Sequence, residues 1–275
     1  GKPEVLMQVY NVIGKTQGQF PMPFGTNIYL YLDLYLQDDE SVKKAIDEAK
    51  YLNQKLKNNL LIIRITRPTT VQIMNYIKDE LKHFSSIVTL IDYANKGFNK
   101  IIKEDFRKNN IGMMMLTSEM FKNKENIQNV LELKIPIFKF GKENLKAIKR
   151  TVIILNDTNS YEQISPIVFD ISSQLKIKTK IFDLDPIGEK DAKSSTLLDH
   201  FENLAKIFNE KIEVVTNSQN PIRELKKEKD MLQLLPLKEK MFKKKFLFRF
   251  FYTNSDFISF NFNKYNQLLI PIVEE

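Results

Sequence analysis

The stretch NIYLYLDLYLQDDESVKKAIDEAKYLNQKL (residues 27–56) decides the fold, because a second stretch, RTVIILNDTNSYEQISPIVFDISSQL (residues 150–175), follows the same order. Each begins with an apolar strand that ends near an acidic residue and continues into an amphipathic helix. Each copy also closes on a short apolar run that contains a proline, Ile135-Pro136-Ile137-Phe138 in the first and Ile270-Pro271-Ile272-Val273 in the second. The sequence therefore predicts two copies of one α/β unit.

Short apolar runs alternate with amphipathic segments through both copies. Continuous apolar strands that are separated by helices are typical of a parallel sheet covered on both faces. We therefore expect an α/β fold with two tandem doubly wound parallel sheets. The predicted strands are 28–36, 60–65, 87–91, 111–116, 135–140, 151–155, 178–182, 211–216 and 231–235. The predicted helices are 39–56, 69–82, 98–109, 122–131, 161–175 and 195–209, with a further helix that begins at Pro221.

Prolines and glycines indicate the domain boundaries. The segment GQFPMPFG (residues 18–25) cannot hold regular structure, so residues 1–25 are predicted to be a terminal helix followed by a linker. Residues 26–149 then form the first α/β domain, and residues 150–275 form the second. The second domain is predicted to contain a carboxy-terminal β-hairpin with strands 246–252 and 257–262, because aromatic residues alternate there and Asn254-Ser255 suits a turn.

The composition argues against several classes of site. The 275 residues include no cysteine, which excludes disulfides and thiolate metal sites. Only two histidines, His83 and His200, are present, which argues against a histidine-rich metal site. No apolar run reaches the roughly 18 residues that span a bilayer. A reducing compartment is compatible with the absence of cysteine.

The repeated unit resembles the universal stress proteins. The features that carry the resemblance are a first strand that ends at Asp33 or Asp157, a long helix, a second strand that ends at Thr66 or Asp183, and a closing Ile-Pro strand. The run VVTNSQNPIRELKKEKDMLQLLPL (residues 214–237) also follows the order of that family. The resemblance covers nearly the whole chain after Gly25 and implies tandem doubly wound domains.

The first residues carry a second resemblance. The segment GKPEVL and the helix that follows it to Ile13 are similar to the last part of the carboxy-terminal lobe of TrkA-type (RCK) potassium-transport regulators. With the GQFPMPFG segment and the two units, the whole looks like the tail of epsilon-proteobacterial TrkA-domain proteins. This resemblance implies a cytoplasmic regulatory module of a potassium-transport protein, without catalytic activity and either free or peripheral to the inner membrane. Its partners would be a membrane cation transporter or channel subunit and further copies of the chain.

Candidate ligand residues lie where strands of the parallel sheets end. Open α/β sheets bind ligands outside the carboxyl ends of their strands, at the point where the strand order reverses. An adenine nucleotide is the expected ligand if one binds, and helix or turn capping by the same carboxylates is the alternative. The nominated residues are Asp33, Thr66, Arg67, Asp92, Asp157, Thr158 and Asp183.

The phosphate-binding device of the resembled family is missing. Universal stress proteins that bind ATP hold phosphate on a glycine-rich loop after the fourth strand, because glycine lets backbone N–H groups approach an anion closely. In this chain the fourth strands are followed by Thr117-Ser118-Glu119-Met120 and by Pro236-Leu237-Lys238, without glycine. A nucleotide would therefore need another mode of binding.

A basic segment near the carboxyl end is a second candidate site. Residues 226–249 carry nine basic and three acidic side chains, and aromatic residues follow them. These lysines could bind an anion, an acidic partner or a membrane surface, whereas solvated surface is the alternative reading. Binding of nucleic acid with base stacking on the aromatic residues is less expected than burial of those residues. The nominated basic residues are Lys238, Lys240, Lys243, Lys244, Lys245 and Arg249.

Overall fold

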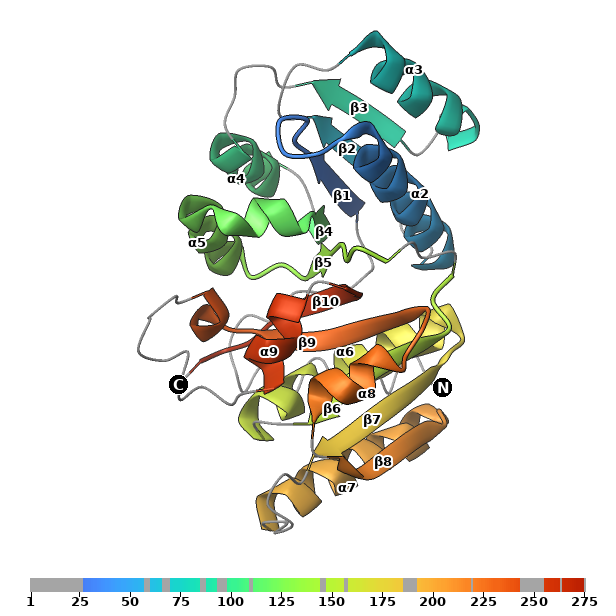
Figure 1. Cartoon of the computed structure of the whole chain (residues 1–275), viewed down its shortest axis with the longest axis vertical. Helices are drawn as coiled ribbons and strands as arrows, with labels where there is room; N and C mark the ends of the chain where they lie inside the picture. Colours follow the sequence, from blue (N-terminus) through green and yellow to red (C-terminus); the bar gives the residue numbers. More distant parts are fainter. Residues whose placement is uncertain are drawn as a thin grey trace. The chain divides into compact units, whose positions relative to one another are not determined.

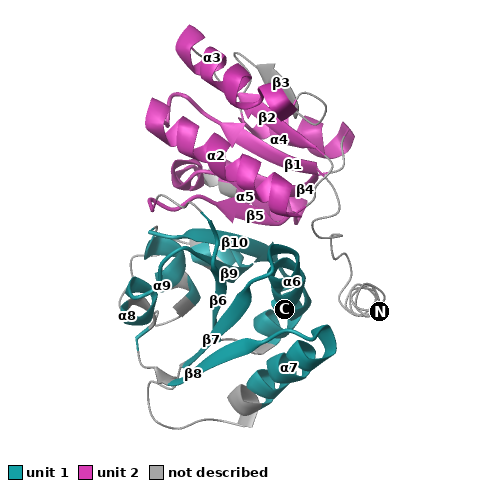
Figure 2. Ribbon diagram, turned by 90° about the vertical axis from the view of Figure 1, so that its right-hand side faces the viewer, with its two compact units in different colours: residues 1–20, 147–275 teal, residues 21–146 magenta. Residues whose placement is uncertain are grey.

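The computed structural model divides the chain into two compact units, one within residues 21–146 and one within residues 147–275 (Figure 2). We call them the amino-terminal unit and the carboxy-terminal unit and describe each by itself. The structure describes residues 27–56, 60–65, 70–84, 88–92, 98–108, 111–143, 147–155, 158–184, 192–218, 220–242, 255–262 and 264–274. The predicted helix and linker of residues 1–25 lie outside these ranges.

The amino-terminal unit is a parallel sheet between two layers of helices (Figure 1). Its strand order is β3-β2-β1-β4-β5. Helices α2 and α3 pack together on one side, and α4 and α5 pack together on the other. The strands are β1 (Asn27–Leu32), β2 (Leu61–Ile65), β3 (Val88–Asp92), β4 (Ile111–Leu116) and β5 (Ile137–Lys139). The helices are α2 (Asp39–Leu56), α3 (Val71–Glu80), α4 (Phe98–Lys108) and α5 (Lys124–Leu133), with short 3-10 turns η1 (Lys82–Phe84) and η2 (Ser118–Lys122).

The carboxy-terminal unit repeats this topology. Its strand order, β8-β7-β6-β9-β10, is the order of the other unit with each strand replaced by its counterpart, and all its strands are parallel. The strands are β6 (Arg150–Leu155), β7 (Lys178–Leu184), β8 (Ile212–Ser218), β9 (Met231–Leu237) and β10 (Asn266–Pro271). The helices are α6 (Thr158–Leu175), α7 (Ala192–Phe208), α8 (Pro221–Lys226) and α9 (Ser255–Phe262), with the 3-10 turn η3 (Glu239–Phe242). The predicted α/β class with parallel sheets is confirmed.

The central strands form because their side chains are apolar on both faces. Residues 28–32 of β1 and residues 152–154 of β6 are essentially inaccessible to solvent. Such runs leave no polar face for water, so each strand must lie in the middle of a sheet that helices cover on both sides. The strand order places β1 and β6 at the centres of their units.

Two matched contacts show how similar the units are. Helices α2 and α6 both have 18 residues, and the sixth residue of each reaches the segment just after the fifth strand. The Lys44 ammonium donates to the carbonyl oxygen of Gly141, and the Gln163 amide donates to the carbonyl oxygen of Val273 at 3.0 Å. Gln163 also accepts from the Val273 N–H at 2.8 Å. In each unit the first helix therefore satisfies backbone groups at the end of the last strand.

A buried ion pair distinguishes the cores of the two units. Arg64 in β2 donates to both carboxylate oxygens of Asp105 in α4, at 2.9 and 3.0 Å, and the Tyr31 hydroxyl donates to the same carboxylate at 3.0 Å. In the carboxy-terminal unit the cross-strand pair that matches Tyr31 and Arg64 is Ile154 and Phe182, which belong to an apolar cluster. At matched positions, the amino-terminal unit therefore has a buried ion pair and the carboxy-terminal unit has apolar side chains.

The predicted carboxy-terminal hairpin is wrong in its second strand. Residues 257–262 belong to helix α9, and residues 246–252 lie outside the described ranges. Within α9, Asp256, Ser259 and Phe260 are buried, which is the three-to-four-residue spacing of a helix face. Ser255 and Asp256 suit the start of a helix because their oxygens can accept hydrogen bonds from free backbone N–H groups. The alternation of aromatic residues was therefore misleading.

We expect Asp105→Ala to lower the free energy of unfolding of the amino-terminal unit by about 3–5 kcal/mol, because it leaves the buried Arg64 charge without its partner. The triple variant Tyr31→Phe, Arg64→Leu, Asp105→Leu should be neutral or more stable, as the apolar core of the other unit suggests. Urea denaturation measures both. A triple variant as unstable as Asp105→Ala would contradict this account.

Candidate functional site

Each sheet has one point where the chain changes direction along the strand order. In the amino-terminal unit it lies between the neighbouring strands β1 and β4, and in the carboxy-terminal unit between β6 and β9. Loops leave these neighbouring strands toward opposite sides, so their carboxyl ends stay uncovered by the next helix. These two switch points are the places where the fold favours a ligand.

Three polar side chains meet at the switch point of the carboxy-terminal unit. Lys238 directly follows β9, Tyr161 lies in the first turn of α6, and Asp256 is the second residue of α9. The Lys238 ammonium donates to one carboxylate oxygen of Asp256 at 3.1 Å, and the Tyr161 hydroxyl donates to the other at 2.5 Å. The exposed fractions are 0% for Tyr161, 5% for Lys238 and 1% for Asp256. We call these residues the Lys238 cluster.

The buried ion pair of the Lys238 cluster occupies this switch point. A lysine ammonium and a carboxylate are costly to bury alone but compensate each other at hydrogen-bond distance. Asp256 also lies in the first turn of α9, where the helix dipole favours a negative charge. The prediction had placed Lys238 at an anion-binding surface, and the structure places its ammonium against a buried carboxylate instead.

The switch point of the amino-terminal unit is built differently. Asp33 directly follows β1, and its carboxylate accepts from the Tyr35 N–H at 3.1 Å, while its own N–H donates to the side chain of Gln37 at 3.1 Å. These bonds give Asp33 the turn-forming role that was the alternative to ligand binding. Thr117 directly follows β4, and the register that pairs Leu30 with Met115 places it across from Leu32, one residue before Asp33.

Thr117 has an unusual hydroxyl. The side chain is buried, with an exposed fraction of 3%, and its oxygen has no hydrogen-bond partner among the residues that the structure describes. The neighbouring Ser118 hydroxyl, by contrast, donates to the carbonyl oxygen of Phe140 at 2.9 Å. A buried hydroxyl without a partner costs free energy, which an additional polar group at this position would recover.

The other nominated ligand residues are not all brought together. Asp92 is the last residue of β3, two strands away from β1, and Asp183 lies buried inside β7. Thr158 is the first residue of α6, at the switch point of its unit. Thr66, Arg67 and Asp157 lie outside the described ranges.

Most of the nominated basic segment cannot be placed. Lys240 belongs to η3, and nothing is described of its side chain. Lys243, Lys244, Lys245 and Arg249 lie outside the described ranges. The anion-binding reading of this segment therefore stays a prediction.

Sequence reasoning missed Tyr161, Asp256 and Thr117. The signal for Asp256 was the Ser255-Asp256 pair before FISFNF, which is typical of a helix start but was interpreted as a hairpin turn. Thr117 could have been found from its position directly after the fourth strand. For Tyr161 the sequence offers no local signal, because its partner Asp256 is 95 residues away.

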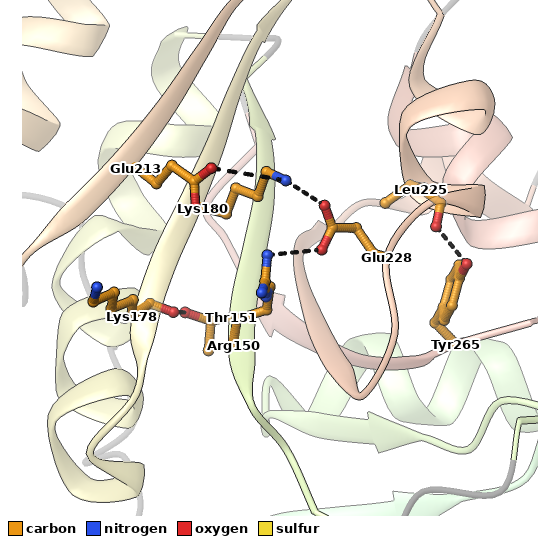
Figure 3. A network of polar contacts seen from close by, with 8 residues as sticks. All are labelled: Arg150, Thr151, Lys178, Lys180, Glu213, Leu225, Glu228 and Tyr265. Atoms are coloured by element: carbon orange, nitrogen blue, oxygen red, sulfur yellow. Dashed lines mark hydrogen bonds and ion pairs between the residues drawn. The ribbon is translucent and has the colours of Figure 1, made fainter.

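A second charged group lies at the amino ends of the strands in the carboxy-terminal unit (Figure 3). The buried carboxylate of Glu228 accepts from Lys180 at 2.5 Å and pairs with Arg150 at 3.3 Å. Tyr265 donates to the carbonyl oxygen of Leu225 nearby. These contacts fasten the turn between α8 and β9 to the start of β6 and to β7, at the edge opposite the switch point. Their position therefore gives them a structural role.

A buried lysine lies at the carboxyl end of β5. Lys139 has an exposed fraction of 3%, and burial lowers its pKa from 10.5 to about 7, against the opposing effect of the Glu119 carboxylate. Burial also lowers the pKa of Lys44, while Glu48 at 4.0 Å opposes that shift. Near neutral pH this edge of the amino-terminal unit therefore contains an amine that takes up or releases a proton.

Comparisons with known proteins show the fold. No family model and no curated protein matches the chain. A protein of Pseudomonas aeruginosa UCBPP-PA14 described as a universal stress protein matches with a TM-score of 0.59 and 9% identity, covering 90% of this chain and 93% of that one. A universal stress protein of Archaeoglobus fulgidus DSM 4304 matches with a TM-score of 0.56 and 12% identity, covering 92% and 98%.

A transporter domain shares the same architecture. The cytoplasmic domain of a prokaryotic cation chloride cotransporter matches with a TM-score of 0.52 and 10% identity, covering 91% of this chain and 97% of that one. At these identities the likeness concerns the fold alone. The predicted resemblance to universal stress proteins is thus confirmed as a shared fold, whereas the link to TrkA-type regulators stays a prediction. Among the described residues, no helix is long and apolar enough to cross a membrane, and no group of acidic or histidine side chains could hold a metal ion.

We expect the stability of the chain to rise with pH above neutrality through Lys139. Its pKa is about 7 in the folded state and 10.5 when exposed, so the unfolded chain binds the extra proton between these values and stability increases with pH across that window. The slope from one such group approaches about 1.4 kcal/mol per pH unit. Urea denaturation at pH 6, 7, 8 and 9 measures it.

The variant Lys139→Met should lose this slope and be more stable than the parent at pH 6, because it buries no charge. Lys78→Met, which changes an exposed lysine on α3, serves as the control and should keep the slope. Equal slopes in the parent and in Lys139→Met would contradict the assignment.

Proposed function

We propose that the chain is a non-catalytic regulatory module of a cation-transport protein and works in the cytoplasm. The observation that carries the proposal is the likeness to the cytoplasmic domain of a prokaryotic cation chloride cotransporter, which extends over 91% of this chain. A match of this extent includes parts of both units of this chain. Potassium is the transported ion that the TrkA resemblance favours.

The non-catalytic part of the proposal rests on the state of the candidate groups. Lys238 and Asp256 hold each other in a buried ion pair, and Asp33 shapes the turn after β1. A general acid or base must reach a proton on the substrate, and these two groups are out of such reach while they are paired with each other. Because these side chains have structural roles, we favour regulation by contact with a partner over catalysis.

The test of this proposal is cation uptake in cells. Removing the coding region for residues 27–275 should change the initial rate of rubidium uptake, because rubidium substitutes for potassium in transport measurements. The amount of the transporter in the membrane should stay the same, and a plasmid copy of the chain should restore the parental rate. Uptake rates that do not differ between parent and deletion at low and high external potassium would exclude this function.

The buried hydroxyl of Thr117 favours a second function, sensing of an adenine nucleotide by the amino-terminal unit. At the switch point of the other unit the polar groups satisfy one another, whereas Thr117 keeps an oxygen without a partner among the described residues. A ligand with polar groups would supply that partner. We therefore place the nucleotide, in this second proposal, beside Thr117 and Asp33.

A thermal-shift screen with ATP, ADP, AMP, NAD and NADH tests nucleotide sensing, because a ligand that binds only the folded state raises the melting temperature. Thr117→Val should abolish the shift. Without ligand, the same variant should be as stable as the parent or more stable by about 1 kcal/mol, because it removes an unsatisfied buried hydroxyl. Thr196→Val, at an exposed position of α7, is the control and should keep the shift. A parent that no nucleotide stabilises would exclude this second function.

A further inference from the structure

The Asp256 carboxylate makes the contacts that a bound oxyanion would make. One carboxylate oxygen accepts a hydrogen bond from the Lys238 ammonium, and the other accepts one from the Tyr161 hydroxyl. The two donors come from elements that flank the switch point, since Lys238 directly follows β9 and Tyr161 lies in the first turn of α6, the helix that follows β6. An ammonium and a hydroxyl that converge on two oxygens are a common way of holding a carboxylate or a phosphate.

The acceptor comes from a different kind of element. Asp256 belongs to α9, the crossover helix between β9 and β10, and not to either strand that borders the switch point. Its position is the one at which the fold favours a ligand. The Asp256 carboxylate therefore occupies the ligand position, although its helix is not part of either strand that borders the switch point.

Helix α9 is a short helix, and the Asp256 carboxylate lies in its first turn. It has eight residues, a length at which an isolated helix is not stable in water. Besides the Asp256 contacts, the carbonyl oxygen of Ser259 accepts from Gln267 at 2.8 Å, and Phe260 is buried. The Asp256 carboxylate is thus one of the contacts that hold the start of α9 on the unit.

We propose that Tyr161 and Lys238 form an oxyanion-binding site at the switch point of the carboxy-terminal unit, and that Asp256 occupies this site as an internal ligand. A small free oxyanion, either a carboxylate or inorganic phosphate, competes with Asp256 for the two donors. Binding of the free oxyanion releases the start of α9. The site thereby links an anion signal to the position of one helix, and this inference stands independently of the proposed functions.

The first experiment removes the internal ligand. Asp256→Ala leaves Tyr161 and Lys238 facing a vacancy, so acetate or inorganic phosphate at 100 mM should raise the melting temperature of this variant by about 3 °C or more above the value in chloride at equal ionic strength. The parent should not be stabilised, because its site is filled. The acetate and phosphate arms show which oxyanion fits.

The double variant Asp256→Ala, Lys238→Met is the matched control. It has the same vacancy without the ammonium, and it should lose the response to both anions. A melting temperature of Asp256→Ala that neither anion raises, or a response that the double variant retains in full, would overturn the proposal.

A second measurement covers the case in which Asp256→Ala does not fold. In the parent chain, cleavage by chymotrypsin after the buried Phe260 reports on the release of α9. Acetate or phosphate should speed this cleavage at least twofold over chloride at equal ionic strength, whereas Asp256→Asn, Lys238→Met, which carries neither charge, should show no difference between the salts. Equal rates in all salts for the parent chain would likewise refute the idea.

Discussion

The parallel pairing of β1 with β4, and of β6 with β9, is the constraint on which the rest of the structure depends. Each pair joins two central strands whose following loops turn to opposite sides of the sheet. The carboxyl ends of these strands are not covered by the next helix in the chain, and polar side chains lie there instead. The two units have different side chains at these strand ends, and the polar contacts at the two switch points therefore differ.

The amino-terminal unit uses short-range contacts at its switch point. Asp33 bonds to backbone and side chains within four residues, and such a turn forms without help from the rest of the unit. The carboxy-terminal unit uses a long-range contact, because Tyr161 and Asp256 are 95 residues apart. Among the described residues, the Thr117 hydroxyl has no hydrogen-bond partner in one unit, whereas each side chain of the Lys238 cluster in the other unit has one.

This difference also explains how much the sequence could predict. The fold could be read from runs such as residues 28–32, because strands that are apolar on both faces must lie inside a parallel sheet. Asp33 could be nominated because it ends such a strand. The pairing of Lys238 with Asp256 could not, because it requires α9 to fold back over β9, and the aromatic alternation after Arg249 pointed to a hairpin instead. The pattern of a short segment does not contain the packing that selects helix over strand.

Because the two units have the same topology, a strand of one unit could pair in the place of its counterpart in the other unit during folding. The apolar strands of the two units are chemically alike, so hydrophobic burial discriminates weakly between them. Arg64 discriminates strongly. In its own unit it meets Asp105, but in the sheet of the other unit the matched position faces Ile154 within an apolar cluster, where the guanidinium would be buried without a carboxylate. Leaving a buried charge unpaired costs several kcal/mol, so this ion pair disfavours exchange of β2 for β7. The Lys238–Asp256 pair likewise disfavours the exchange of strands between the units. If Lys238 paired with an acidic side chain of the amino-terminal unit, the buried Asp256 carboxylate would lose its partner.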